Sequence, residues 1–237
     1  KLEYHLLGNH LLENGFALLF GAYYFNDHAF YKKAKTILIP ELQEQVLGDG
    51  GHFERSPMYH CIMLYRVLDC YNLVCNNALF GKELEDTLKE KAGGMLGWLE
   101  EVVYSDGRIP LLNDAAVGIA PTAKELIEYG QRLGIFCSKK VRLKESGYRK
   151  FRWGKFELFI DVGEVGPDYQ PGHAHADTFS FELYINGRPV IVDTGTSTYE
   201  VNNTRFYERS TAAHNTVVVC GQNSSQVWAA HRVARRA

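Results

Sequence analysis

Two histidines separated by a single residue form the first pattern in this chain that could bind a metal ion. They are His173 and His175, and in an extended segment the side chains at positions i and i+2 lie on the same face. An Asn186-Gly187 pair, a strong hairpin signal, would fold the segment that ends at Asp193 back toward His175. His214 follows a polar loop further along the chain. These spacings predict that several possible metal ligands meet at neighbouring strand ends.

Zinc accepts two imidazoles and a carboxylate as ligands, with water in the remaining position. We therefore predict that His175, Asp193 and His214 bind Zn²⁺. Each of these residues alone could also be a hydrogen-bonded structural histidine or a turn aspartate. Three such residues near neighbouring strand ends are less easily explained in that way, and spacing alone leaves both interpretations open.

A second pattern, in the first helix-like segment, could do acid–base chemistry. It consists of Asn9, His10 and Glu13. On a helix, residues i and i+3 share a face, so Glu13 could orient the imidazole of His10 and raise its basicity. A plain polar helix face would have the same residues.

Two polar loops add further candidates for a site. Residues 50–60 combine glycines with Glu54, Arg55, Tyr59 and His60 at the expected start of a helix, a place where function is often found. Residues 106–114, which end in Asn113 and Asp114, lie at the end of a helical hairpin. This second loop could reach a substrate cleft or be an ordinary surface turn.

The elements that must position these residues change character along the chain. Up to about residue 135, apolar residues recur at helical spacing, which predicts helices over 11–23, 28–46, from 57, over 82–103 and over 122–133. Asp27 and Ser56 are the expected caps of the second and third helices. Alternating strand patterns follow over 156–162, 178–185, 190–192 and 216–220. We expect the boundary between the helical and β parts at residues 136–142.

Composition limits the class of protein. The chain has 237 residues, 46% of them hydrophobic, with a formal net charge of −2. These values are typical of a folded globular protein. The sequence shows no basic excess that would indicate nucleic-acid binding and no apolar run of about 18 residues that could span a membrane. The chain starts without Met in a helix-like pattern and ends after a strand-like stretch, so we expect it to be a fragment.

Three segments together resemble the heparinase II/III family of polysaccharide lyases. They are residues 8–15, residues 51–60, and a C-terminal set comprising residues 173–177, 192–195 and 209–216. The resemblance covers nearly the whole chain, and three motifs in this order are specific. Their order and spacing are also similar to those of the alginate lyases related to that family.

The resemblance implies a fold and a set of roles. The family pairs an incomplete α/α toroid with an antiparallel β-sandwich, so residues 1–138 would be a toroid segment and residues 139–237 a sandwich segment. The family's catalytic Asn, His and Tyr match Asn9, His10 and Tyr59, and a further catalytic His matches His173. Its structural zinc ligands match the set proposed above, His175, Asp193 and His214.

Some members of the family use a second catalytic tyrosine, for which Tyr199 is the first candidate and Tyr207 the second. The polar residues around the matched motifs are then expected to contact substrate: Glu13, Glu54, Arg55, His60, Asn113 and Asp114.

The implied reaction is β-elimination on an acidic polysaccharide that contains uronic acid. Asn9 and His10 would bind the uronate carboxylate, and Tyr59 would move protons as base at C5, acid at O4, or both. A tyrosine base needs a pKa below its ordinary value of about 10, for which Arg55 and His173 could supply positive charge. Few Arg/Lys clusters are present, which favours a non-sulfated glycan.

Two other functions remain open from the sequence. One is a hydrolase that uses the zinc ion to activate water, and the other is a non-catalytic glycan-binding module. Paired carboxylates of a metal-free glycosidase do not stand out. Family habit implies an exported protein, periplasmic or secreted.

Overall fold

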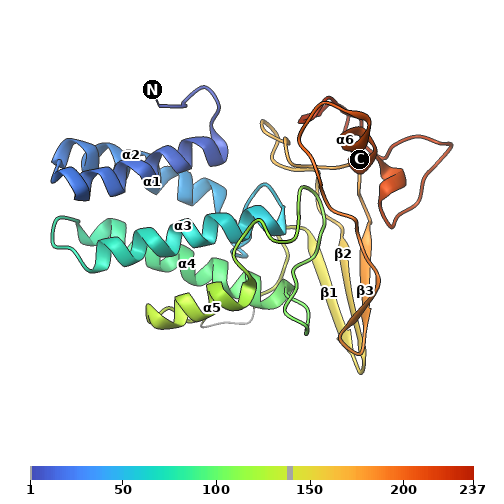
Figure 1. Ribbon diagram of the computed structural model, residues 1–237, viewed down its shortest axis with the longest axis horizontal. Coiled ribbons are helices and arrows are strands. Elements are labelled where there is room, and N and C mark those ends of the chain that lie inside the picture. Colours follow the sequence, from blue (N-terminus) through green and yellow to red (C-terminus); the bar gives the residue numbers. More distant parts are fainter. Residues whose placement is uncertain (1, 138–140) are drawn as a thin grey trace.

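The computed structural model describes residues 2–137 and 141–237 of the chain. Helices α1 to α5 form one half of the molecule, and an antiparallel sheet with its long loops forms the other (Figure 1). The sheet strands run roughly across the direction of the helices (Figure 1). The N-terminal ends of α1 and α3 face the β half, which places residues 8–10 and 57–59 near the junction.

The helices follow the sequence pattern closely. They are α1 (Gly8–Phe25), α2 (His28–Gln45), α3 (Pro57–Cys75), α4 (Lys82–Val102) and α5 (Ala123–Arg132). The predicted caps are confirmed, because Asp27 accepts hydrogen bonds from Ala29 N and Phe30 N, and Ser56 accepts one from Tyr59 N. Such caps satisfy backbone donors that have no partner within the helix.

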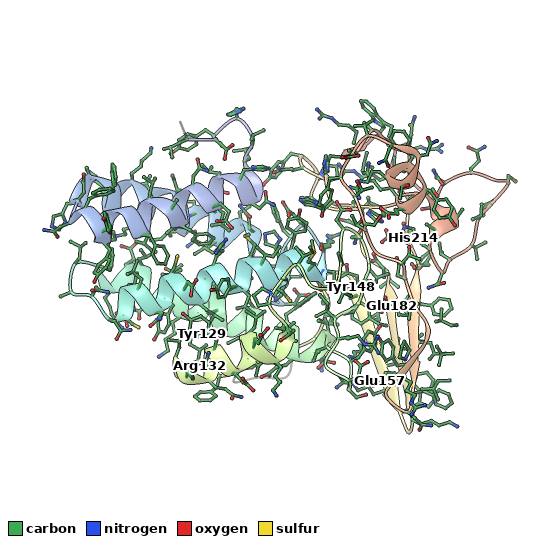
Figure 2. The ribbon with its side chains drawn as sticks, viewed as in Figure 1. Tyr129, Arg132, Tyr148, Glu157, Glu182 and His214 are labelled. Atoms are coloured by element: carbon green, nitrogen blue, oxygen red, sulfur yellow. The ribbon has the colours of Figure 1, made fainter. Side chains whose placement is uncertain are left out.

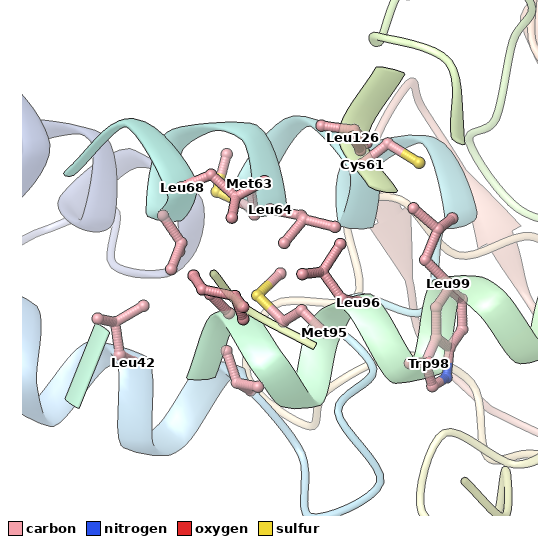
Figure 3. Close-up of a cluster of buried hydrophobic side chains, with 14 of the residues drawn as sticks. Leu42, Cys61, Met63, Leu64, Leu68, Met95, Leu96, Trp98, Leu99 and Leu126 are labelled. Atoms are coloured by element: carbon pink, nitrogen blue, oxygen red, sulfur yellow. The ribbon is translucent and has the colours of Figure 1, made fainter. Parts of the chain in front are cut away.

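The helical core lies between α3 and α4 and is closed by the other helices. Figure 3 shows side chains such as Leu64, Leu68, Met95 and Leu99 pointing into the space between these two helices. Trp98 is 1% exposed and packs beside them while its Nε1 donates to Ser146 Oγ at 3.0 Å. Burial of this apolar surface is the main term that stabilises the helical half.

The sheet is a meander of four strands in the order β1-β2-β3-β4. The strands are β1 (Tyr148–Trp153), β2 (Phe156–Asp161), β3 (Phe181–Ile185) and β4 (Arg188–Ile191). Asn186 and Gly187 have φ of 53° and 68° between β3 and β4, as a two-residue hairpin turn with right-handed strand twist requires. The predicted hairpin is therefore confirmed.

The C-terminal region is mostly irregular. It contains α6 (Asn203–Glu208), the short 3₁₀ helix η1 (Thr211–Ala213), and a two-stranded ribbon of β5 (Val227–Trp228) and β6 (Arg232–Val233). The strand predicted over residues 216–220 is wrong. Only an isolated bridge between Val219 and Gln222 forms there, and Val217 is 76% exposed, because no neighbouring strand of the described chain pairs with this run.

Polar contacts join the two halves. Tyr104 OH donates to Glu182 Oε2 at 2.7 Å, and Lys150 Nζ donates to the backbone oxygens of Val102 and Val103 at the end of α4. Figure 2 shows Glu157 and Glu182 at the sheet, facing the helical half. The predicted boundary between residues 138 and 139 lies outside the described residues.

One close backbone contact sits in the helical half near this junction. Gly50 has a φ of +87°, and a Cβ atom on it would lie 2.1 Å from the carbonyl oxygen of Gly94 in α4. Only glycine allows both this conformation and this approach. None of the described helices has the combination of length and apolar character that a membrane span needs.

Candidate active site

A cavity of about 650 Å³ opens where the N-terminal end of α1 meets the β half. Asn9 and His10 come from α1, Glu54 from the loop before α3, His173 from the loop before β3, and His231 from the turn between β5 and β6. The sequence motifs around residues 9, 54 and 173 therefore meet at one place, although they are far apart in the chain.

Tyr59 and Tyr199 complete an aromatic group beside this cavity. The rings of Tyr59 and His173 are stacked with centroids 3.8 Å apart, and the hydroxyls of Tyr59 and Tyr199 are 3.2 Å apart, within hydrogen-bonding distance. Tyr59 lies in the first turn of α3, where the Ser56 cap fixes its backbone. Tyr199, the first candidate for a second tyrosine, thus contacts Tyr59, whereas Tyr207 lies on α6 and is 59% exposed.

The proton on Tyr59 is held tightly in the absence of substrate. Burial raises the pKa of Tyr59, and the nearby Asp114 and Glu54 raise it further, whereas the Tyr199 hydrogen bond and Arg205 lower it. The expectation of a lowered pKa is therefore wrong for the unliganded protein. Arg55, one of the expected sources of positive charge, turns away and donates to the backbone oxygen of Glu164.

Glu54 is a buried carboxyl group at the cavity wall. Asn9 Nδ2 donates to its Oε2 at 3.5 Å, and His173 Nε2 lies 3.7 Å from the same oxygen. Burial raises the pKa of Glu54 to about 7, and His173 and Asn9 oppose that rise. Glu54 lies between Asn9 and His173, both expected to be catalytic. This position indicates that Glu54 holds these two residues in place, rather than contacting substrate as predicted.

His10 lines the cavity from its exposed side, but its partner differs from the expected one. His10 Nδ1 lies 3.9 Å from Glu3 Oε2, while Glu13 accepts a hydrogen bond from Arg66 Nε at 3.1 Å. The i, i+3 pairing of His10 with Glu13 is therefore wrong. Arg66 draws the Glu13 carboxylate across to α3, away from the cavity.

Asp114 is the centre of a buried hydrogen-bond network behind the cavity. Its Oδ2 is 2.9 Å from His173 Nδ1, and its Oδ1 is 2.7 Å from His175 Nε2. Both guanidinium Nη atoms of Arg205 donate to the same carboxylate, and Thr196 Oγ1 donates to Oδ1 at 2.8 Å. Burial raises the pKa of Asp114, but these hydrogen bonds outweigh it and hold the pKa well below its ordinary value.

His60, Asn113 and Asp114 do not reach the cavity, contrary to the expected substrate contacts. His60 is fully buried against Trp98, with Nε2 bonded to Met95 O at 3.0 Å. Asn113 has a φ of 57°, donates to Arg55 O and accepts from His175 N. The polar atoms of these residues make hydrogen bonds within the protein. Their partners could not be predicted from sequence spacing.

The residues expected to hold zinc lie together in the β half, where Figure 2 labels His214. His214 Nδ1 is 2.7 Å from Asp193 Oδ2, and the His175 and His214 ring centroids are 5.2 Å apart. His175 Nδ1 and His214 Nε2 are buried atoms without a hydrogen-bond partner in the described protein. A zinc ion would satisfy these two imidazole nitrogens, so the residue types fit the metal. Asp193 Oδ2 is bonded to Nδ1, the other nitrogen of the His214 ring, and these three residues are not among the described sets whose ligand atoms all lie within 4.8 Å of one another.

A different set of residues has donor atoms closer together. Within the described ranges, Asp114, His173 and His231 offer ligand atoms that all lie within 4.8 Å of one another. The Arg205 guanidinium already occupies both carboxylate oxygens of Asp114. This positive charge disfavours a cation there, and hydrogen bonding explains the cluster.

Three residues of the site gave no signal in the sequence. His231 stacks on Tyr199 with ring centroids 5.5 Å apart and lines the cavity. Arg205 from α6 and Thr196 from the segment after β4 hold Asp114, and no motif marked either residue. Arg205 is fully buried, and a buried arginine cannot be recognised from its position in a short polar segment.

Taken together, these features define a mixed α+β protein with acid–base side chains where its helical and β parts meet. Two family models match the chain: the heparinase II/III N-terminus over residues 1–142, and the heparinase II/III-like C-terminal model over residues 138–237. The chain belongs to the heparinase II/III family.

Similar proteins in sequence are heparin-sulfate lyases. That of Bacteroides stercoris is 26% identical over 94% of this chain and 37% of its own length. That of Pedobacter heparinus is 27% identical over 79% of this chain and 32% of its own length. The chain thus spans about a third of the length of these relatives.

Solved structures support the same fold. A heparinase III crystal structure matches with a TM-score of 0.72 and 21% identity, covering 93% of this chain and 40% of that one. A heparan sulfate lyase from Pedobacter heparinus matches with a TM-score of 0.67 and 22% identity, covering 92% and 38%.

Proposed function

We propose that the protein containing this chain is a polysaccharide lyase that cleaves a uronic-acid glycan by β-elimination and leaves an unsaturated uronate end. The observation that carries this proposal is the stack of Tyr59 on His173, with Tyr59 hydrogen-bonded to Tyr199 beside the cavity. Elimination needs one group that accepts a proton at C5 and one that donates a proton at O4. A histidine and a tyrosine in contact can supply both.

The carboxylate of the uronic acid must be stabilised as the C5 proton leaves, because negative charge then builds on it. Asn9 and His10 line the cavity at the N-terminal end of α1 and are placed to donate hydrogen bonds to that carboxylate. The helix N-terminus adds a favourable field for an anion.

We assign the proton transfers from the hydrogen bonds and surroundings of the two side chains. His173 donates Nδ1–H to Asp114, which leaves a lone pair on Nε2 to accept the C5 proton. Tyr59, whose proton is held tightly, donates it to O4 as the C4–O4 bond breaks and the C4–C5 double bond forms. Transfer of the proton from His173 back to Tyr59 restores the site.

The substrate we propose is a glycan of the heparan-sulfate type, because the curated relatives carry that name. Two arginines at the cavity, Arg232 and Arg236, suit an anionic chain. This replaces the weaker expectation of a non-sulfated glycan, which counted only clusters in the sequence.

Further features of the whole protein belong to the same proposal. The helices would form part of an incomplete α/α toroid and the sheet part of a β-sandwich, with the enzyme periplasmic or secreted. Zinc held by His175, Asp193 and His214 would be structural and would fix the loop that carries His173. These three residues are at most 7% exposed, which disfavours the alternative of a hydrolase that activates water at this metal.

The proposal is tested on the full-length parent protein with a panel of heparan sulfate, alginate and hyaluronan. The absorbance of a new C4–C5 double bond is followed for wild type and Tyr59→Phe. A rise that the variant loses supports elimination. New reducing ends without that absorbance would point to hydrolysis, and neither product with measurable glycan binding would point to a binding module.

A further inference from the structure

We infer that Asp114 is a positioning residue whose single carboxylate sets the tautomers of two histidines, the metal-facing His175 and the cavity-facing His173, and thereby couples the metal site to the acid–base site. The inference rests on the proposed function for the role of His173. It replaces the expected role of Asp114 in substrate binding.

The geometry at His175 selects one tautomer. Its Nε2 lies 2.7 Å from Asp114 Oδ1, and an ionised carboxylate only accepts hydrogen bonds, so Nε2 carries the proton. The lone pair is then on Nδ1, the buried atom that has no partner among the described protein atoms. A neutral imidazole with a free, buried Nδ1 is ready to bind a metal ion.

The geometry at His173 selects the opposite tautomer. Its Nδ1 lies 2.9 Å from Asp114 Oδ2 and must carry the proton for the same reason. Nε2 lies 3.7 Å from Glu54 Oε2, beyond hydrogen-bonding distance, and Asn9 Nδ2 donates to that oxygen, so the lone pair is on Nε2, on the side of Glu54 and the cavity. The same carboxylate therefore leaves the lone pair of His175 on the side of the proposed metal site and the lone pair of His173 on the side of the cavity.

Asp114 is built into the fold so that its carboxylate stays ionised and fixed. Arg205 donates to both carboxylate oxygens and is itself held by Ala230 O at 2.8 and 3.0 Å. The backbone of Asp114 is also fixed: its N donates to His173 O at 3.0 Å, and its carbonyl accepts from Ser56 Oγ at 2.6 Å. Asp114 and Arg205 are both fully buried, so solvent does not weaken their pairing.

An asparagine at this position cannot serve both histidines. Its amide has one oxygen that accepts and one nitrogen that donates, so only one imidazole keeps an acceptor and the other faces an N–H. The second imidazole then has to present a lone pair to the amide and move its proton to its other nitrogen. The expected result is a changed tautomer at His173 or at His175.

The test uses full-length parent protein with ¹⁵N-labelled histidine. Imidazole tautomers are read from long-range ¹H–¹⁵N couplings, and bound zinc is measured by mass spectrometry after dialysis against a range of free zinc. The variants are Asp114→Asn combined with Arg205→Gln, which removes both charges of the buried pair, and Thr196→Val, which removes one hydrogen bond to the carboxylate but leaves it ionised.

In wild type we expect Nδ1–H at His173, Nε2–H at His175 and one zinc per chain. In the double variant we expect one tautomer to change and zinc affinity to fall about 10–100-fold, as for other groups that orient metal-binding histidines. Thr196→Val should keep both tautomers.

Several outcomes overturn the inference. One is a folded double variant with both tautomers and the zinc affinity of wild type, and another is a wild type that binds no metal. If the double variant does not fold, the wild-type spectrum decides, because Nε2–H at His173 or Nδ1–H at His175 contradicts the geometry. These readouts need no substrate, so an absence of lyase activity would count against the proposed function and leave this inference standing.

Discussion

Tyr59 is the residue on which the proposed chemistry depends most directly. Its ring is held by stacking on His173 and its hydroxyl by Tyr199, so Tyr59→Phe removes the hydroxyl and keeps the stacking. We expect kcat for elimination to fall about 10²–10⁴-fold, the usual contribution of one proton-transfer group.

The matched control is Tyr24→Phe, at an 80% exposed tyrosine near the end of α1 that is remote from the cavity. It should retain wild-type kcat. Equal kcat in wild type and Tyr59→Phe, with both proteins folded, would remove Tyr59 from the mechanism.

Glu54 should make stability depend on pH. Burial raises its pKa from 4.5 to about 7 against the lowering effect of His173, and Asp114 raises it further. Below pH 4.5 the group is neutral in both folded and unfolded chains. As pH rises from about 4.5 to 7, only the unfolded chain loses the proton, so stability falls.

Glu54→Gln removes this dependence. The free energy of unfolding of Glu54→Gln minus that of wild type should increase by up to roughly 3 kcal/mol as pH rises from about 4.5 to about 7. Urea unfolding of the full-length protein measures this difference. Glu90→Gln, at an exposed position of α4, should follow wild type. A wild-type to Glu54→Gln difference that stays constant with pH would show that Glu54 ionises normally.

At the scale of single residues, the sequence predicted which motifs lie together but not which hydrogen bonds their side chains make. Asn9, His10, Glu54 and His173 line one cavity as expected, because each belongs to a motif with a characteristic spacing. Arg205 and Asp114 are 91 positions apart, and no spacing rule connects them. Glu13 pairs with Arg66, 53 positions away, and not with His10 in the same helix as the i, i+3 spacing predicted. No spacing rule connects Glu13 with Arg66 either.

Among the elements, the loop before α3 depends on a glycine that two constraints require. A Cβ atom at Gly50 would meet the backbone of Gly94, whereas Gly107 has a similar φ of +89° and no atom within 4 Å. Gly107→Ala should therefore cost only the strain of the left-handed conformation, about 1–2 kcal/mol. Gly50→Ala should cost roughly 1–3 kcal/mol more, because α4 must move.

Thermal unfolding of the two variants measures the difference. Similar Tm values for Gly50→Ala and Gly107→Ala would mean that the contact between the loop and α4 adjusts without cost.

Helices were easier to predict than strands in this chain. A helix contains its own hydrogen-bond partners, so the caps at Asp27 and Ser56 and the apolar spacing were sufficient. A strand needs a partner from elsewhere. Residues 217–219 have strand-forming side chains but remain exposed, and the local sequence carries no information about whether a neighbouring strand is present.

For the whole molecule, the proposed zinc ion should stabilise the folded state. A ligand that binds only the folded protein adds about 4 kcal/mol at a concentration 1,000 times its Kd. We expect a chelator to lower the Tm of the full-length protein, zinc to restore it, and His214→Ala to abolish the response to both.

His28→Ala, at an exposed position at the start of α2, should keep the response to chelator. Identical Tm values for wild type with and without chelator, together with no zinc in the purified protein, would exclude a structural metal.

The hydrogen bond between the Tyr59 and Tyr199 hydroxyls joins residues 140 positions apart. During synthesis, chain closure over such a span comes late, because the C-terminal partner must first leave the ribosome and the ordering of the long loop must be offset by packing. In the nascent chain, Tyr59 is therefore synthesised long before Tyr199 is available to form the pair. On the proposed function, the enzyme would then remain inactive until translation of this region is complete.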